Sequence, residues 1–386
     1  MYDCIVVGAG IEGCSSAYQL AKNGYSTLLL EQFPLPHNRG SSHGQTRITR
    51  YSYGQKHFSD MMLEAYPMWK QLEEEANTTL YSKTGVFQLE EPPYEDYNNH
   101  LKCLKSINKP YRLYSGKEIN QEFPGVRFED HYKGMLELDG GVLMANKCLQ
   151  SYQNQFVKFG GTLQDGEKVL QILPGRRHTI VTNKGRYLAK SVVLTPGPWA
   201  SQLLKPLEIH LPLQPQRVNV CYWKEKIPGT YASYPCLLDL STRKYGAGMY
   251  ALPSTDYPGL MKVCYLHTGK DVDSPDHRDY VRIGKQRDID TMRQYIREHF
   301  PGLHGEQPAI LETCMFTSTP DGDPVIDRHP LYPNLIFAVG MSGHGFKLAP
   351  VFGKILFEMA TGRPLSYDIT PVSMKRYSRS TTVSKL

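Results

Sequence analysis

The sequence predicts an α/β protein of two domains, and three features of the 386-residue chain support this prediction. A short apolar run at residues 4–7 leads into Gly8, Gly10 and Gly13, which have the spacing G-x-G-x-x-G. A second pattern of apolar strand, glycine loop and helix lies at residues 334–362, near the C-terminus. Between them, residues 217–318 contain the aromatic and β-branched runs that are typical of a separate sheet.

The N-terminal segment has the order of elements expected of a Rossmann-like dinucleotide-binding unit. A strand at residues 4–7 is followed by an amphipathic helix that stops at Gly24, and a second strand at residues 28–30 ends at Glu31. The three glycines of the motif would make the turn, admit a pyrophosphate and pack helix on strand, while Glu31 would accept ribose hydroxyls. NAD and FAD both use this unit, so the motif alone does not distinguish them.

Basic residues follow directly after this unit. Residues 39–50, "RGSSHGQTRITR", predict a Gly/Ser-rich loop with Arg39, His43, Arg47 and Arg50. Taken alone, such a composition is also typical of a solvated surface loop.

The chain is expected to return to the nucleotide domain twice. Residues 140–212 predict a helix, a hairpin about residues 183–185, a strand at 191–195 and a helix that begins near Trp199. At residues 334–362 the glycine loop leads into a helix with Pro350 in its first turn, and such a helix N-terminus stabilises anionic charge. We therefore predict a discontinuous nucleotide domain of residues 1–80, 139–216 and 319–386, and a substrate-binding domain of residues 81–138 and 217–318.

Composition narrows the class of protein. A net charge of +6 without basic clusters gives no nucleic-acid surface, and no apolar run is long enough to span a membrane. The eight cysteines lack zinc-site spacing, and the N-terminus lacks the features of a secretory signal, so we expect reduced thiols and no metal. The last residues, Ser384, Lys385 and Leu386, match the S-K-L signal that a peroxisomal import receptor reads, so we expect a peroxisomal location, and the alternative is an accidental tripeptide.

Four separated motifs resemble the monomeric sarcosine oxidase family, most closely its peroxisomal sarcosine oxidase/L-pipecolate oxidase branch. They are the N-terminal fingerprint with "SSHGQTRITR", then "DYPGLMKV", "ETCMFTSTPD" and "MSGHGFKLAP", in this order along nearly the whole chain. The resemblance implies a D-amino-acid-oxidase-like flavoprotein that binds FAD, with an antiparallel sheet over the isoalloxazine ring. It also implies a monomer.

The resemblance assigns roles to individual residues. Cys314 matches the cysteine that is joined by a thioether to the flavin 8α carbon, and Arg50 and Lys347 match the pair that binds the substrate carboxylate. Lys262 matches the lysine linked to oxygen activation. Phe316 and Leu266 depart from the family, standing where many relatives carry Tyr and bacterial members carry His, respectively.

The candidate residues form two sets. The candidate catalytic residues are Lys262, Arg47, His43, Arg50, Lys347 and Tyr250. The candidate cofactor-binding residues are Gly8, Ala9, Gly10, Ile11, Glu12, Gly13, Glu31, Gln32, Arg39, Ser42, His43, Arg47, Val169, Gly197, Trp199, Cys314, Met341, Gly343, Gly345, Phe346 and Lys347.

The expected activity is FAD-dependent oxidation of a secondary amino acid, such as sarcosine or L-pipecolate, to an imine with reduction of dioxygen to hydrogen peroxide. Two alternatives remain open. The first is a flavin-linked amine dehydrogenase that passes electrons to a protein acceptor. The second is a non-catalytic flavin-binding sensor, which would have no need of a carboxylate-binding pair.

Overall fold

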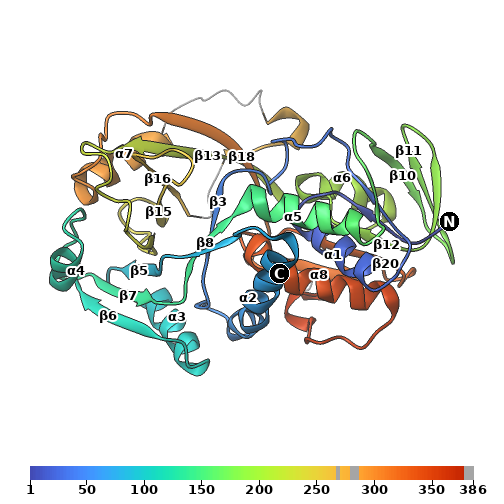
Figure 1. Ribbon diagram of the computed structural model, residues 1–386, viewed down its shortest axis with the longest axis horizontal. Helices are drawn as coiled ribbons and strands as arrows, with labels where there is room; N and C mark the ends of the chain where they lie inside the picture. The colour runs from blue at the N-terminus through green and yellow to red at the C-terminus, as the bar shows by residue number, and fades with distance from the viewer. Residues whose placement is uncertain (267–269, 279–286, 378–386) are drawn as a thin grey trace, which may run out of the picture.

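The computed structural model describes residues 1–266, 270–278 and 287–377. Two large sheets lie side by side along the long axis of the molecule, and the N-terminus is at the outer end of the first one (Figure 1). The residues of the expected import signal, Ser384 to Leu386, lie outside the described residues. Within the described residues, no helix has the length and apolar character needed to cross a membrane.

The first sheet has eight strands. They are β1 (Tyr2–Val7), β2 (Thr27–Leu30), β9 (Thr162–Gln164), β10 (Val169–Leu173), β11 (His178–Thr182), β12 (Arg186–Leu194), β19 (Val325–Arg328) and β20 (Leu335–Val339). Its centre, β20-β12-β1-β2-β9, is parallel, while β10, β11 and β19 add antiparallel edges. Strands from distant parts of the chain therefore build one nucleotide-binding type of sheet.

The two faces of this sheet are both buried, as expected of parallel strands. Along β1, Val6 packs into a core formed with the helices α1 (Ile11–Lys22), α5 (Ala145–Lys158) and α8 (Gly345–Thr361). Ile5 and Val7 point to the opposite face, where β10, β11 and the short helix α6 (Ala200–Leu204) cover the sheet. This alternation explains why the strand reads as a continuous apolar run.

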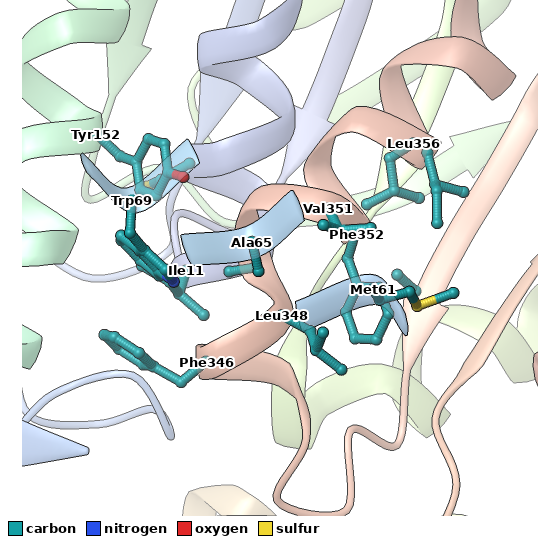
Figure 2. Close-up of a cluster of buried hydrophobic side chains, with 14 of the residues drawn as sticks. Ile11, Met61, Ala65, Trp69, Tyr152, Phe346, Leu348, Val351, Phe352 and Leu356 are labelled. Carbon is teal, nitrogen blue, oxygen red and sulfur yellow. The ribbon is translucent and has the colours of Figure 1, made fainter. Parts of the chain in front are cut away.

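The helix α2 (Lys56–Ala76) completes the helical layer, and the sequence patterns had not indicated it. Met61, Ala65 and Trp69 recur every four residues and face α8, as Figure 2 shows. The Trp69 ring is nearly parallel to the Phe346 ring at 6.1 Å, and its indole N–H donates to the Lys347 carbonyl at 3.0 Å. Through these contacts α2 fixes the first turn of α8.

The second sheet has nine strands and is antiparallel except for the pair β5–β14. Its strands are β5 (Val86–Glu90), β6 (Tyr111–Ser115), β7 (Lys133–Glu137), β13 (Gln214–Lys224), β14 (Cys236–Asp239), β15 (Met249–Pro253), β16 (Leu260–Tyr265), β17 (Lys270–Asp271) and β18 (Ile310–Ser318). The helix α7 (Arg287–His299) packs on its outer face, where Met261 and Val263 of β16 point. Two further helices, α3 (Glu95–Ser106) and α4 (Gly116–Glu122), adjoin β5, β6 and β7.

Two local expectations were wrong. The loop predicted over residues 39–50 contains a strand, β3 (Thr46–Thr49), which pairs with β8 (Gly141–Met144) in a third sheet that also includes β4 (Tyr81–Lys83). Its Thr and Ile residues favour extended backbone once a partner strand is present. The C-terminal helix begins at Gly345, so Pro350 is inside α8 rather than in its first turn.

The remaining elements are short 3₁₀ turns. They are η1 (Gly197–Trp199), η2 (Lys205–Leu207), η3 (Pro275–His277), η4 (Thr370–Val372) and η5 (Met374–Tyr377). All eight cysteines fall within the described residues, and each is a free thiol. In the same part of the chain, no three His, Cys, Asp or Glu side chains are grouped as metal ligands.

The close contact between α8 and α1 predicts a stability effect. A Cβ on Gly353 would lie 2.2 Å from the Ser15 Oγ and 2.8 Å from the Ser15 carbonyl carbon, so Gly353→Ala must push the helices apart. We expect the free energy of unfolding to fall by about 1 to 3 kcal/mol. Gly185→Ala is the matched control, because its Cβ would meet no atom within 4 Å. Equal melting temperatures for the two variants would contradict this packing.

Candidate active site

One large cavity lies where the two sheets meet. Its volume is about 1860 Å³, which is more than the roughly 300 to 1,000 Å³ of a site for a drug-sized ligand. Its walls come from the ends of parallel strands β1, β2, β12 and β20 and from the inner face of the second sheet. Every candidate residue except Gly13 lines this cavity.

The glycine motif forms one end of the cavity. Gly8 has φ 100°, and a Cβ on Gly13 would lie 1.9 Å from the Gly8 carbonyl oxygen, so Gly13 lets α1 approach β1 without itself reaching the cavity. The Glu31 carboxylate accepts from the Ala9 N–H at 2.9 Å and the Phe33 N–H at 3.1 Å. This cradle of backbone and carboxylate matches the pyrophosphate and ribose of an adenine dinucleotide, so the residues present fit such a cofactor.

The loop before β3 crosses the middle of the cavity. The Arg47 guanidinium donates to the carbonyls of Ser41 and His43 at 2.8 and 2.7 Å, and so holds the loop in shape. The His43 ring contacts the carbonyls of Gly40 at 2.7 Å and Thr313 at 3.2 Å. Burial, opposed by these carbonyls, lowers the pKa of His43 to about 4, so the ring is neutral at physiological pH.

These contacts place Cys314 at the cavity wall. It lies on β18 between the buried Met315 and Thr313, whose carbonyl contacts His43. Cys314 is partly exposed, whereas the other seven cysteines are buried. Its Sγ is 3.8 Å from the Ser41 carbonyl oxygen. The thiol is therefore directed toward the loop and the cavity.

Two cations are buried together at another wall. Arg50 and Lys347 are 6% and 8% exposed, and they lie 4.9 and 5.7 Å from the centroid of the same ring, Tyr53. Burial, with the charges of Arg50 and Arg47, holds the pKa of Lys347 well below its ordinary value. A buried pair of cations is a strong site for an anion, because an anionic ligand supplies the compensating charge.

A third group of residues lies on the inner face of the second sheet. Lys262 of β16 is 5% exposed and sits 5.9 Å from the ring centroid of Tyr222 and 5.7 Å from that of Tyr250. Burial is the main cause that lowers the pKa of Lys262. Burial also raises the pKa of Tyr250, whose phenol therefore stays neutral.

The sequence patterns missed several residues at this cavity. Glu312 lines it and accepts from the Tyr257 hydroxyl at 3.0 Å, while the Arg278 guanidinium donates to the carbonyls of Asn38 and Arg39 at 2.7 and 3.0 Å. Glu312 is two residues from Cys314 on one strand, so strand periodicity could have indicated it. Arg278 follows a short turn between sheets, and no local pattern marks it.

Taken together, the cavity can hold a dinucleotide at its glycine end, a carboxylate at Arg50 and Lys347, and negative charge near Lys262. Four glutamates are among the described residues that line it, Glu12, Glu31, Glu167 and Glu312, and the Glu31 carboxylate is already bound by the N–H groups of Ala9 and Phe33. This arrangement suits redox chemistry on a small carboxylic acid, with the bond-breaking chemistry supplied by a cofactor.

Comparison with known proteins agrees with this geometry. The family model described as "DAO: FAD dependent oxidoreductase" matches residues 3–359. The chain is 46% identical to the peroxisomal sarcosine oxidase of Mus musculus, over 100% of this chain and 97% of the relative. It is 34% identical to a monomeric sarcosine oxidase of a Bacillus species, over 97% of each chain.

Solved structures share the fold. NikD, an unusual amino acid oxidase essential for nikkomycin biosynthesis, gives a TM-score of 0.83 at 23% identity, over 96% of this chain and 97% of that one. The L-proline dehydrogenase of P. horikoshii gives 0.82 at 19% identity, over 98% of both chains.

The lowered pKa of Lys347 predicts how anion binding depends on pH. A bound carboxylate stabilises the ammonium form, so it raises the pKa of Lys347 back toward its ordinary 10.5 and its binding takes up a proton. Between the two pKa values, we expect the affinity for acetate to fall as the pH rises, by up to about tenfold per unit. Calorimetry in buffers of different ionisation enthalpy would measure the proton uptake.

Lys347→Met should abolish this proton uptake, and Lys262→Met, which removes a buried lysine from another wall, should keep it. Uptake that survives in the Lys347 variant would show that another group titrates.

Proposed function

Because the chain belongs to the DAO family of FAD-dependent oxidoreductases, and within it to the sarcosine oxidases, it is an FAD-dependent amino-acid oxidase, and we propose that its substrates are N-methyl and cyclic amino acids. Sarcosine and L-pipecolate are the two compounds that we expect it to oxidise, with dioxygen as the electron acceptor. The main support is the buried pair of Arg50 and Lys347 beside a cavity of dinucleotide size.

The glycine end of the cavity is the expected binding place of the FAD adenosine and pyrophosphate. Gly8 and Gly10 line this end, the Ser42 hydroxyl accepts from the Ile11 N–H at 3.0 Å, and Glu31 supplies the carboxylate for the ribose. When bound, FAD supplies the acceptor for the hydride equivalent from substrate and the route for both electrons to dioxygen. The first turn of α8, residues 345–347, adds a helix N-terminus at the cavity wall.

Arg50 and Lys347 orient the substrate by its carboxylate. A guanidinium binds a carboxylate through two nitrogens and an ammonium adds a point charge, so the pair fixes both position and direction. The apolar side chains of Phe316, Leu252 and Leu266 line the same cavity and favour a substrate with an apolar body, such as the ring of pipecolate. Together, the two cations and these apolar side chains set the orientation of the substrate.

The proposed reaction removes two electrons and two protons from the substrate. A hydride equivalent leaves the carbon attached to nitrogen and a proton leaves the nitrogen, which gives an imine, while dioxygen is reduced to hydrogen peroxide. Water then converts the sarcosine imine to glycine and formaldehyde, whereas the cyclic imine of pipecolate can persist. No side-chain base is required when the amine binds in its free form.

Lys262 is the residue that we expect to assist oxygen. Its ammonium is buried on the sheet face that covers the cavity, and a fixed cation in a dry site stabilises the negative charge that builds up on dioxygen. Burial lowers the pKa of Lys262, whereas the neighbouring Cys264 and Glu312 raise it, so the charge of Lys262 depends on these neighbours.

Cys314 is the proposed point of covalent attachment, through a thioether to the flavin 8α carbon. Formation of this bond removes two electrons and two protons from the thiol and the methyl group, and dioxygen takes them as hydrogen peroxide. His43 and Arg47 hold the loop that faces the thiol, so they are the positioning groups for this attachment.

We expect a peroxisomal monomer, and the location is supported by the names of the mouse and human relatives, which are both called peroxisomal sarcosine oxidase. The import receptor remains a prediction from the sequence.

The deciding experiment is release of hydrogen peroxide under air with sarcosine, L-pipecolate and glycine. The proposal expects peroxide with the secondary amino acids. A protein-linked dehydrogenase would instead reduce an artificial dye and release none, and a sensor would do neither. Absence of peroxide with every secondary amino acid tested would overturn the oxidase assignment.

The proposed tether predicts that colour survives unfolding. After acid precipitation, the wild-type pellet should stay yellow, whereas Cys314→Ser should release its flavin into the supernatant. Cys103→Ser, at a buried thiol on α3, is the control and should behave as wild type. A colourless wild-type pellet would exclude a covalent bond.

The role of Lys262 predicts that the two half-reactions separate. Lys262→Met keeps the side-chain length without the charge, so anaerobic bleaching by substrate should persist while reoxidation by air slows by a factor of about 100 or more. Lys262→Arg, which keeps a positive charge, should recover part of the rate. Stopped-flow absorbance measures both steps, and an unchanged reoxidation rate in the Met variant would remove Lys262 from oxygen activation.

A further inference from the structure

A carboxylate without surface exposure, Glu137, lies behind the buried pair of cations. It ends strand β7 of the second sheet and is 0% exposed, yet it lies outside the cavity lining and has no part in the proposed chemistry. A buried carboxylate is costly unless it is fully hydrogen-bonded, so its partners indicate its role.

Among the described residues, the Glu137 side chain accepts hydrogen bonds from the two residues that follow Arg50. Its Oε1 accepts from the Tyr51 N–H at 2.6 Å, and its Oε2 accepts from the Ser52 N–H at 3.1 Å and the Ser52 hydroxyl at 2.6 Å. The Ser52 hydroxyl in turn accepts from the Gln88 amide of β5. Three donors on one short turn therefore converge on a single carboxylate.

The same turn holds the Arg50 guanidinium. The Arg50 Nε donates to the Ser52 carbonyl at 2.8 Å, so Ser52, whose N–H and hydroxyl bind Glu137, also holds Arg50 through its carbonyl. Among the described residues, no carboxylate forms a direct ion pair with Arg50 or Lys347. The Glu137 carboxylate instead lies against the turn that follows Arg50, and burial raises its pKa against the opposing effects of the Ser52 and Tyr51 donors and of the Arg50 charge.

We propose that Glu137 is a positioning residue for the carboxylate-binding Arg50, so that a strand of the second sheet sets substrate affinity through the turn at residues 50–52. This inference rests on the proposed carboxylate-binding role of Arg50. It assigns Glu137 no contact with substrate. Its effect is to hold the guanidinium where a carboxylate can meet it together with Lys347.

Glu137→Gln removes this anchoring with little change in volume. The amide has one acceptor oxygen, and its NH₂ group must face one of the donors on Tyr51 or Ser52, so the turn has to shift. We expect KM for sarcosine and Kd for acetate to rise about tenfold or more, as for the loss of a charge-assisted contact, with kcat changed less than about threefold. Acetate binding is measured by calorimetry, independently of turnover.

A matched control is Asp239→Asn. Asp239 is also buried in the second sheet, is 1% exposed and accepts from Tyr295 and Ser241 at 3.0 Å, but it is not part of the cavity wall. The Asp239→Asn variant should have a lower melting temperature, but its KM for sarcosine and its Kd for acetate should not rise. A KM increase of the same size in both variants would show that Glu137 acts only through general stability.

The double mutant with Arg50→Ala separates positioning from other effects. If Glu137 acts through Arg50, Glu137→Gln should add little once Arg50 is absent, so the two effects on Kd should be far from additive. Full additivity would overturn the inference. If Arg50→Ala alone leaves Kd unchanged, the carboxylate-binding proposal itself fails, which is a different outcome.

Should Glu137→Gln fail to fold, Ser52→Ala provides the second test. It removes the hydroxyl donor to Glu137 and keeps the backbone, so it should raise Kd for acetate in the same direction by a smaller factor, and again only when Arg50 is present. An unchanged Kd in Ser52→Ala would then count against the inference.

Discussion

Burial of two positive charges around one aromatic ring is the constraint on which the rest of the site depends. Arg50 and Lys347 both lie within 6 Å of the Tyr53 ring centroid with very little exposure to solvent, and each would lose several kcal/mol of hydration there without compensation. Part of the compensation is structural, from the Ser52 carbonyl and the carboxylate of Glu137 behind it. In the proposed site, an anionic ligand would supply the remainder, and the unfavourable burial of these cations would become binding energy for its carboxylate.

The position of this pair follows from the way the helices pack. α8 brings Lys347 to the cavity, and its first turn is fixed by the Trp69 indole of α2 and by the stacked Phe346 ring. Arg50 arrives from the end of β3, which belongs to a small third sheet between the larger ones. Neither residue could be shifted without disturbing a buried core, which is why a charged pair can be held so far from water.

Sequence reasoning identified the parts of the site that depend on local pattern. The G-x-G-x-x-G turn and Glu31 at the end of β2 carry signals within a few neighbouring residues, and the cavity contains all but Gly13 of the candidates. The family resemblance supplied the proposed roles of Cys314, Arg50, Lys262 and Lys347, which no local pattern could give.

The parts that were missed depend on contacts between distant segments. In the sequence, Glu137 is one more charged residue at the end of a predicted strand. Its hydrogen-bond partners, Tyr51 and Ser52, are 85 residues away or more and become its neighbours only in the folded chain. The helix α2 was overlooked because Pro67 lies within it and because its N-cap residue, Gln55, forms no capping hydrogen bond with its side chain. Met61, Ala65 and Trp69 nevertheless recur at helical spacing. The strand β3 forms because β8 pairs with it, and its four residues are too short a run to predict.

The order in which the cavity walls occur along the chain has a consequence for biosynthesis. The glycine turn is synthesised first, strand β18 with Cys314 comes much later, and Lys347 follows almost at the end of the described chain. A ribosome-bound chain can therefore form the N-terminal βαβ unit early, but it cannot enclose a dinucleotide until α8 has left the exit tunnel. Cofactor capture is in this sense a late step, and a chain cut short before α8 would leave the quality-control machinery with a protein that lacks its prosthetic group.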